Sequence, residues 1–199
     1  MNRILIVAEH DGRTLNLSTA KCVSCAKAIG GDIDIAVLGQ GHDDVASQAA
    51  ALAGVTRVLV ISAEHLAHPL AANWAPEVHA LAADYTHVLG PSTTMGKDLM
   101  PRVAALAGVN QFSDVMEVLS PQSFRRPIYA GNAIIDASAP EGQKIIMTVR
   151  AASWPAAGSG GVAVIEQRTP ASSAAGHTRY IGLNSAGGER PDLQSATKV

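Results

Sequence analysis

The segment 87–99, HVLGPSTTMGKDL, combines an apolar run, small hydroxyl residues and a Gly-Lys pair, as a phosphate-binding loop does. A P-loop reads G-x-x-x-x-G-K-[ST], and its final hydroxyl reaches a magnesium ion. Here five residues separate Gly90 from Gly96, and Asp98 follows Lys97 where Ser or Thr is needed. Because a carboxylate repels phosphate, the segment does not predict a Walker-type site.

The same segment still predicts a turn from a strand into a helix, and two interpretations of that turn stay open. Its free backbone N–H groups could hold an anion. Alternatively, Ser92, Thr93 or Thr94 caps the helix and the turn has no ligand.

The two cysteines, Cys22 and Cys25, have the C-x-x-C spacing of dithiol redox sites. Redox chemistry requires a lowered thiol pKa, which a helix N-terminus supplies. The helical pattern begins near Ser18, so the pair lies inside the helix, where two small apolar residues are the simpler interpretation. A zinc site would need further ligands, and the sequence has no second C-x-x-C.

The histidines and acids offer no catalytic constellation. His65 and His68 are followed by Pro69 and are expected at the surface, and His87 is expected to be structural. Glu9, His10 and Asp11 are adjacent and cannot all converge on one point. The sequence also has no G-x-S-x-G elbow, so we assign no catalytic, cofactor-binding or metal-ligating residue to this chain.

Apolar runs alternate with Ala-rich helical patterns over the first half of the chain. Strands are predicted at Arg3–His10, Asp32–Leu38, Thr56–Ile61 and Tyr85–Gly90. Helices are predicted at Ser18–Ile29, Asp43–Ala53, Leu70–Ala83 and Met95–Ala107. This order predicts an α/β fold: a Rossmann-like, mostly parallel sheet flanked by helices in three layers.

From Ser113 onward, strands follow one another without helices, which predicts an appended antiparallel β meander. Its strands are expected at Asp114–Leu119, Ser123–Ala130, Ala133–Ser138 and Gln143–Arg150. Gly131-Asn132 predicts a two-residue hairpin loop, and Pro140 with Gly142 predicts a tight turn. Val162–Arg168 could add one more strand.

The meander is either an interaction surface or a solvated sheet face. Its polar residues include Arg125, Arg126, Asp136 and Lys144. Arg125, Arg126, Tyr129 and Arg150 lie beside apolar residues, a composition found at interfaces.

Composition excludes several classes of function. The 199 residues carry a formal net charge of −2 and no dense Lys/Arg cluster, so nucleic-acid binding is disfavoured. No apolar run approaches the ~20 residues of a membrane span. The N-terminus enters a strand at once and has no secretory pattern, so we expect a cytoplasmic protein.

Several motifs, taken in order, resemble the N-terminal domain of the electron transfer flavoprotein α subunit. They are LIVAEHDGRTLNLST, YTHVLGPSTTMGKDLMPRVAALAGV, QFSDVMEV, FRRPIYAGNAI and IIMTVRAASW, and the similarity continues to RPDLQSATKV at the end. The resemblance implies a scaffold and subunit-docking domain of an electron carrier that is not itself an enzyme.

In that family the α subunit pairs with a β subunit into a heterodimer. The heterodimer carries FAD, and it passes electrons from acyl-CoA and other dehydrogenases of fatty acid β-oxidation to a quinone oxidoreductase. A structural AMP belongs to the β subunit. The flavin is held mainly by a C-terminal domain of the α subunit.

The resemblance therefore predicts an α/β domain at residues 1–186 and a linker or tail at 187–199 that leads toward the FAD-binding domain. The family's flavin-binding residues would lie beyond Val199, so none can be assigned here. We expect this chain alone not to bind FAD tightly.

The alternative is an independent α/β domain that binds AMP or ATP at the loop Gly90–Asp98. Lys97→Ala would abolish ligand binding in that case, and it would leave folding and partner pairing intact if the loop is scaffold.

Overall fold

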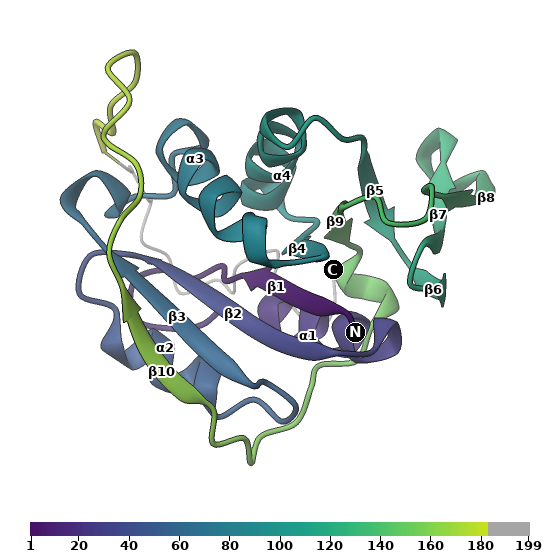
Figure 1. Cartoon of the computed structure of the whole chain (residues 1–199), viewed down its shortest axis with the longest axis horizontal. Helices are drawn as coiled ribbons and strands as arrows, with labels where there is room; N and C mark the ends of the chain where they lie inside the picture. The colour runs from purple at the N-terminus through teal and green to yellow at the C-terminus, as the bar shows by residue number, and fades with distance from the viewer. Residues whose placement is uncertain (183–199) are drawn as a thin grey trace, which may run out of the picture.

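The structure is a computed structural model that describes residues 1–182. A seven-stranded parallel sheet forms its centre, with the strand order β10-β3-β2-β1-β4-β9-β5 (Figure 1). The strands are β1 (Arg3–Val7), β2 (Asp32–Gly39), β3 (Arg57–Ser62), β4 (His87–Pro91), β5 (Gln111–Val115), β9 (Ile145–Val149) and β10 (Val164–Arg168).

Helices cover both faces of this sheet, so the three-layer prediction is confirmed. The α-helices are α1 (Leu17–Ile29), α2 (Asp43–Ala50), α3 (Ala71–Leu81) and α4 (Thr94–Leu106). Short 3₁₀ helices are η1 (Glu64–Leu66), η2 (Ala82–Asp84), η3 (Tyr129–Gly131) and η4 (Ala151–Ser153). α1 and α2 pack on one face, and α3 and α4 pack on the other (Figure 1).

The strands form because their side chains are apolar on both faces, as parallel strands require. In β1, Ile4 and Ile6 join the core beneath α1 and α2, while Leu5 and Val7 join the core beneath α3 and α4. Every one of these four side chains is fully buried.

A smaller antiparallel sheet follows, with the order β6-β7-β8. Its strands are β6 (Glu117–Ser120), β7 (Ser123–Ile128) and β8 (Ala133–Ser138). Phe124 anchors this sheet to the main body, because its ring meets Phe112 of β5 at a centroid distance of 5.0 Å. Figure 1 shows the β7–β8 hairpin projecting from one side of the molecule.

The predicted meander was wrong in its last strand. Ile145–Val149 is β9, which lies between β4 and β5 and pairs in parallel with both. All five residues are buried, as expected of an internal parallel strand. The turn at 140–142 therefore connects two different sheets and does not form a hairpin.

Two boundaries around the meander also differ from prediction. The expected strand Asp114–Leu119 is divided between β5 and β6 at Met116, and Asp114, which has a left-handed φ of 55°, lies within β5 where its pairing with β9 is irregular. The β7–β8 hairpin is confirmed, but Ile128 pairs with Ala133, so four residues rather than two form its loop.

The expected strand at 162–168 is present as β10, which pairs in parallel with β3 at one end of the sheet. The whole of the predicted tail, 187–199, and the last residues of the predicted domain, 183–186, lie outside the described residues. Within residues 1–182, no helix combines the length and apolarity needed to cross a bilayer.

Candidate functional site

A crevice lies at the carboxyl ends of β1 and β4. These strands are neighbours, yet the chain continues from them toward opposite ends of the sheet, the arrangement at which open α/β sheets bind ligands. The crevice has a volume of about 390 Å³. Its lining is Asn16, Leu17, Ser18 and Lys21 from the start of α1, Ser92, Thr93, Thr94 and Lys97 from the start of α4, and Ala151.

Side-chain caps already occupy part of both helix starts. The Asn16 side chain accepts a hydrogen bond from the Ser18 N–H at 2.9 Å. Thr93 Oγ1 accepts from the Gly96 N–H at 3.3 Å, so the predicted cap of α4 is confirmed and is made by Thr93. These caps satisfy backbone donors that an anion would otherwise use.

The Gly-Lys pair of the loop has structural roles in the fold. A Cβ atom on Gly96 would lie 1.8 Å from the Pro91 carbonyl oxygen, so only glycine fits where α4 approaches the end of β4. Lys97 Nζ lies 3.8 Å from Asp114 Oδ1, and the Ser92 hydroxyl donates to the same carboxylate. A carboxylate beside the lysine lowers the affinity of the crevice for phosphate.

Glu9, His10 and Asp11 point to three different partners, as their adjacency predicted. Glu9 accepts from the Ser18 hydroxyl at 2.9 Å. Asp11 accepts from the backbone N–H groups of Arg13 and Thr14, and these bonds lower the pKa of its carboxyl.

His10 is held as a neutral imidazole by its two neighbours. The Gly12 N–H donates to Nδ1 at 3.1 Å, so Nε2 carries the proton and donates to the Leu38 carbonyl at 2.9 Å. Burial lowers the pKa of His10, and the nearby His42 lowers it further. His10 therefore orders the loop before α1.

Cys22 and Cys25 lie inside α1 and face the core, where both are buried. Burial raises the pKa of Cys25 to about 12 and raises that of Cys22 well above its ordinary value. Neither thiol supplies a thiolate at neutral pH, so dithiol redox chemistry is not supported.

The three histidines singled out in the sequence as non-catalytic, His65, His68 and His87, have different surroundings. His87 is fully buried, and its Nε2 donates to the Pro121 carbonyl at 2.8 Å. His68 is exposed and stacks on Tyr180, while His65 is only partly exposed. In the described part of the chain, no three His, Cys, Asp or Glu side chains are grouped as a metal site would require.

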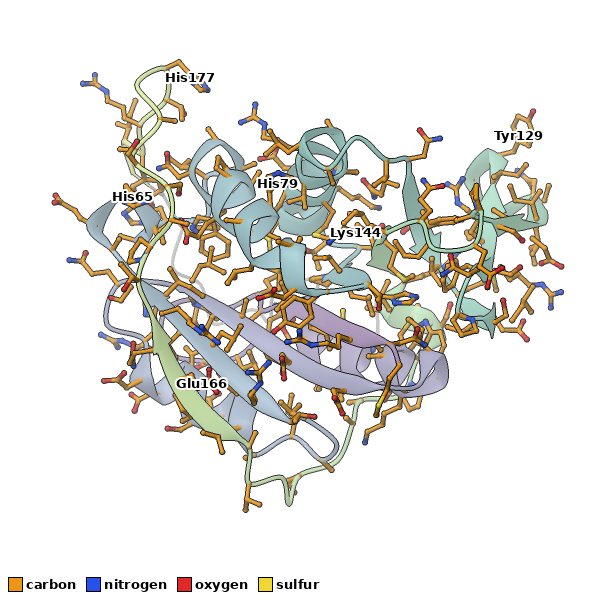
Figure 2. All side chains as sticks on the ribbon, in the orientation of Figure 1. His65, His79, Tyr129, Lys144, Glu166 and His177 are labelled. Carbon is orange, nitrogen blue, oxygen red and sulfur yellow. The ribbon has the colours of Figure 1, made fainter. Side chains whose placement is uncertain are left out.

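The projecting antiparallel sheet has an exposed apolar tip. Tyr129, whose side chain points outward in Figure 2, is 79% exposed. Ile134 is 56% exposed. Tyr129 and Ala130 have φ angles of 49° and 55°, a left-handed conformation that non-glycine residues rarely adopt. Backbone strain of this kind is concentrated at functional positions.

An ion-pair ladder crosses the outer face of the same sheet. Arg125 of β7 bonds Asp136 of β8 at 2.8 Å and Glu117 of β6 at 2.9 Å. Arg126 points the other way and donates to the Ser113 carbonyl at 2.7 Å, so it ties the sheet to β5. The ladder therefore links all three strands of the small sheet, and the bond from Arg126 connects that sheet to β5.

Two of the residues assigned to the meander lie elsewhere, because β9 belongs to the parallel sheet. Lys144 donates to the Tyr85 carbonyl at 2.8 Å and to the Ala82 carbonyl near the end of α3. Arg150 follows β9 and lines a hollow of about 440 Å³ beside the crevice, together with Lys97 and Asp114.

Sequence reasoning missed two polar clusters that the fold assembles. One is the buried carboxylate of Asp34, which accepts from Arg57 and from the Tyr85 hydroxyl. The other is the pair Asn73 and Glu77 on α3, which receives the backbone of residues 171–175. The spacing of Asn73 and Glu77 in the apolar sequence AANWAPEVHAL was the available signal, because positions i and i+4 share a helix face.

Comparison with known proteins gives one family. Residues 4–173 match the sequence model of the electron transfer flavoprotein domain. Among similar proteins, the electron transfer flavoprotein subunit alpha of Pseudomonas aeruginosa is 45% identical over 197 residues, which is 98% of this chain and 63% of the relative. That of Paracoccus denitrificans is 40% identical over 197 residues, with the same two shares.

A more distant relative is the mitochondrial electron transfer flavoprotein subunit alpha of Arabidopsis thaliana. It is 33% identical over 210 residues, which cover 98% of this chain and 58% of the relative. The chain thus spans about three-fifths of the length of these relatives.

Proposed function

The chain belongs to the electron transfer flavoprotein domain family, and from that premise we propose that residues 1–182 are a scaffold and subunit-docking domain. The partner is an electron transfer flavoprotein β subunit. The redox chemistry takes place on polypeptide other than these residues.

The observation that carries this proposal is the projecting sheet β6–β8. It combines an exposed aromatic residue and exposed aliphatic residues at its tip with a ladder of ion pairs that links its three strands. Aromatic anchors on a fixed backbone are typical of protein–protein interfaces, because little side-chain entropy is lost when they are buried. Isolated apolar residues also occur on ordinary surfaces, but here they coincide with a strained turn.

The crevice at the carboxyl ends of β1 and β4 does not fit an FAD site. The crevice between β1 and β4 presents no aromatic side chain to stack on an isoalloxazine ring. One backbone donor at each helix start is occupied by Asn16 or Thr93, and the lining residue Lys97 has the Asp114 carboxylate 3.8 Å from its Nζ. We therefore infer that FAD, which the family carries, is bound by other parts of the α–β assembly.

Residues 1–182 would then form a platform in the assembled protein, which transfers electrons from acyl-CoA and other dehydrogenases to a quinone oxidoreductase. The part played by residues 1–182 is to hold the subunits in place. We propose no catalytic residue among them, and we place the protein in the cytoplasm.

Substitution of Ile134 by Asp tests the docking surface. The change puts a charge on the exposed tip and should weaken pairing with the cognate β subunit at least tenfold, measured by isothermal titration, without altering the melting temperature. Leu106→Asp is the matched control, because Leu106 is 47% exposed at the end of α4, away from the sheet. Equal loss of affinity in both variants, or none in either, would contradict the proposed surface.

The crevice favours a second candidate, binding of AMP or ATP, because it lies at the topological switch point and contains Lys21 and Lys97. The proposal above predicts no micromolar binding of either nucleotide. Such binding, abolished by Lys97→Ala, would support the second candidate.

A further inference from the structure

The segment after β10 turns back along α3 and is held there by side chains of that helix. We call residues 169–182 the latch. In Figure 1 this segment leaves the end of β10 and passes the loop that leads into α3. Figure 2 shows His177 on the outermost part of the latch, away from the body of the protein.

Glu77 makes the strongest attachment of the latch. Its two carboxylate oxygens accept from the backbone N–H groups of Ala171 and Ser172 at 2.8 and 2.9 Å, and from the Ser172 hydroxyl at 2.6 Å. Glu77 is 1% exposed. Among the described residues it has no ion-pair partner, so the latch supplies the hydrogen bonds that a buried carboxylate requires.

Two further attachments lie toward the start of α3 and in the loop before it. Asn73 lies one turn before Glu77, and its side-chain oxygen accepts from the Ala175 N–H at 2.8 Å. His68, in the loop before α3, stacks on Tyr180 at a centroid distance of 3.6 Å. Because later latch residues meet earlier residues of the α3 region, the latch runs antiparallel to the helix.

Little apolar burial holds the latch in place. None of its side chains is buried, and a hollow of about 600 Å³ separates its outer part from η1 and the start of α3. The attachment therefore depends on a few polar contacts to two buried side chains and on one stacking contact between exposed rings. Segments held in this way open at a lower free energy than the core to which they are attached.

We propose that the latch is a detachable clasp that sets the path by which the chain leaves the edge strand β10. Glu77 and Asn73 are its positioning residues. When their hydrogen bonds to the latch break, residues 169–182 are released while the seven-stranded sheet stays intact. If the proposed function is right, the clasp fixes where polypeptide beyond the platform departs from it. Release of the clasp would widen the range of positions open to that polypeptide.

Amide hydrogen exchange of the whole chain, followed by NMR, tests the clasp. The N–H groups of Ala171, Ser172 and Ala175 should exchange at least tenfold more slowly than in an unstructured peptide. Glu77→Gln should raise the exchange of Ala171 and Ser172 about tenfold, because an amide cannot accept all three bonds. The amides of β1 and β4 should keep their protection.

A second variant changes a residue of the latch and leaves the sequence of the core unaltered. Ser172→Ala removes the hydroxyl bond to Glu77 and should raise the exchange of Ala171 several-fold. Ser173→Ala is the matched control, because Ser173 is exposed and its hydroxyl bonds none of the described residues. It should leave that exchange unchanged.

The clasp would be refuted if the three latch amides exchange freely in the parent chain, or if Glu77→Gln raises exchange equally in the latch and the sheet. It would also be refuted if Ser172→Ala and Ser173→Ala behave alike. These results are independent of subunit pairing, so a chain that fails to bind a β subunit refutes the proposed function alone.

Discussion

At the scale of single residues, the buried carboxylate of Asp34 joins three parts of the fold through its hydrogen bonds. Asp34 is 1% exposed, and it accepts from Arg57 Nη2 at 2.5 Å and from the Tyr85 hydroxyl at 2.6 Å. The three residues come from β2, β3 and the turn before β4, so they join elements that are distant in sequence.

Removal of the Tyr85 hydroxyl should therefore destabilise the fold. Tyr85→Phe leaves the buried carboxylate with one partner fewer, and we expect the free energy of unfolding to fall by about 1–2 kcal/mol in urea titrations. Tyr129→Phe is the control, since its exposed ring should give a change within about 0.5 kcal/mol. Equal stability of the two variants would contradict this role of Tyr85.

His87 should make stability depend on pH. Burial lowers its pKa from the ordinary value of 6.5, so the unfolded chain binds a proton before the folded chain does. The free energy of unfolding should be unaffected above pH 6.5 and should fall by up to about 1.4 kcal/mol per pH unit below it.

The variant His87→Gln should show a smaller loss of stability between pH 7.5 and pH 5 than the parent, although His10 contributes to both. An identical pH profile in parent and variant would show that His87 is not held neutral in the fold.

At the scale of elements, the close approach of Gly96 to the Pro91 carbonyl determines how near the start of α4 packs to the end of β4. Gly96→Ala would place a methyl group 1.8 Å from the Pro91 carbonyl, and relief of that clash should cost about 1–3 kcal/mol in unfolding free energy. Gly158→Ala, where nothing lies within 4 Å of the added Cβ, should be nearly neutral. A neutral Gly96→Ala would show that the helix start can shift freely.

Sequence patterns predicted the first four strands, the helices between them and the three-layer fold, because continuous apolar runs such as ILIV report burial on both faces. They misplaced β9, since the turn residues Pro140 and Gly142 suit a hairpin as well as a connection between sheets. Local sequence carries no information on which distant strand a buried run will pair with.

The candidate site shows the same limit. The cap by Thr93 was predictable from local chemistry. The partners of Glu77 were not, because 94 positions separate Glu77 from Ala171. Which surface is left exposed likewise depends on the assembled sheets, and the assignment of Arg150 to the meander was wrong for that reason.

At the scale of the whole molecule, a parallel sheet with its polar groups largely satisfied supports one projecting antiparallel sheet. Its crevice is lined by helix caps and by a lysine that faces a carboxylate. This distribution is better suited to a platform that positions other polypeptide than to a domain that itself holds a redox group.

The most direct measurement is to mix the purified chain with its cognate electron transfer flavoprotein β subunit and determine the mass of the complex by light scattering, with the absorption spectrum of the chain alone recorded beforehand. We predict a one-to-one complex and a colourless chain. A folded chain that carries stoichiometric flavin by itself, or that forms no complex with a folded β subunit, would contradict the account.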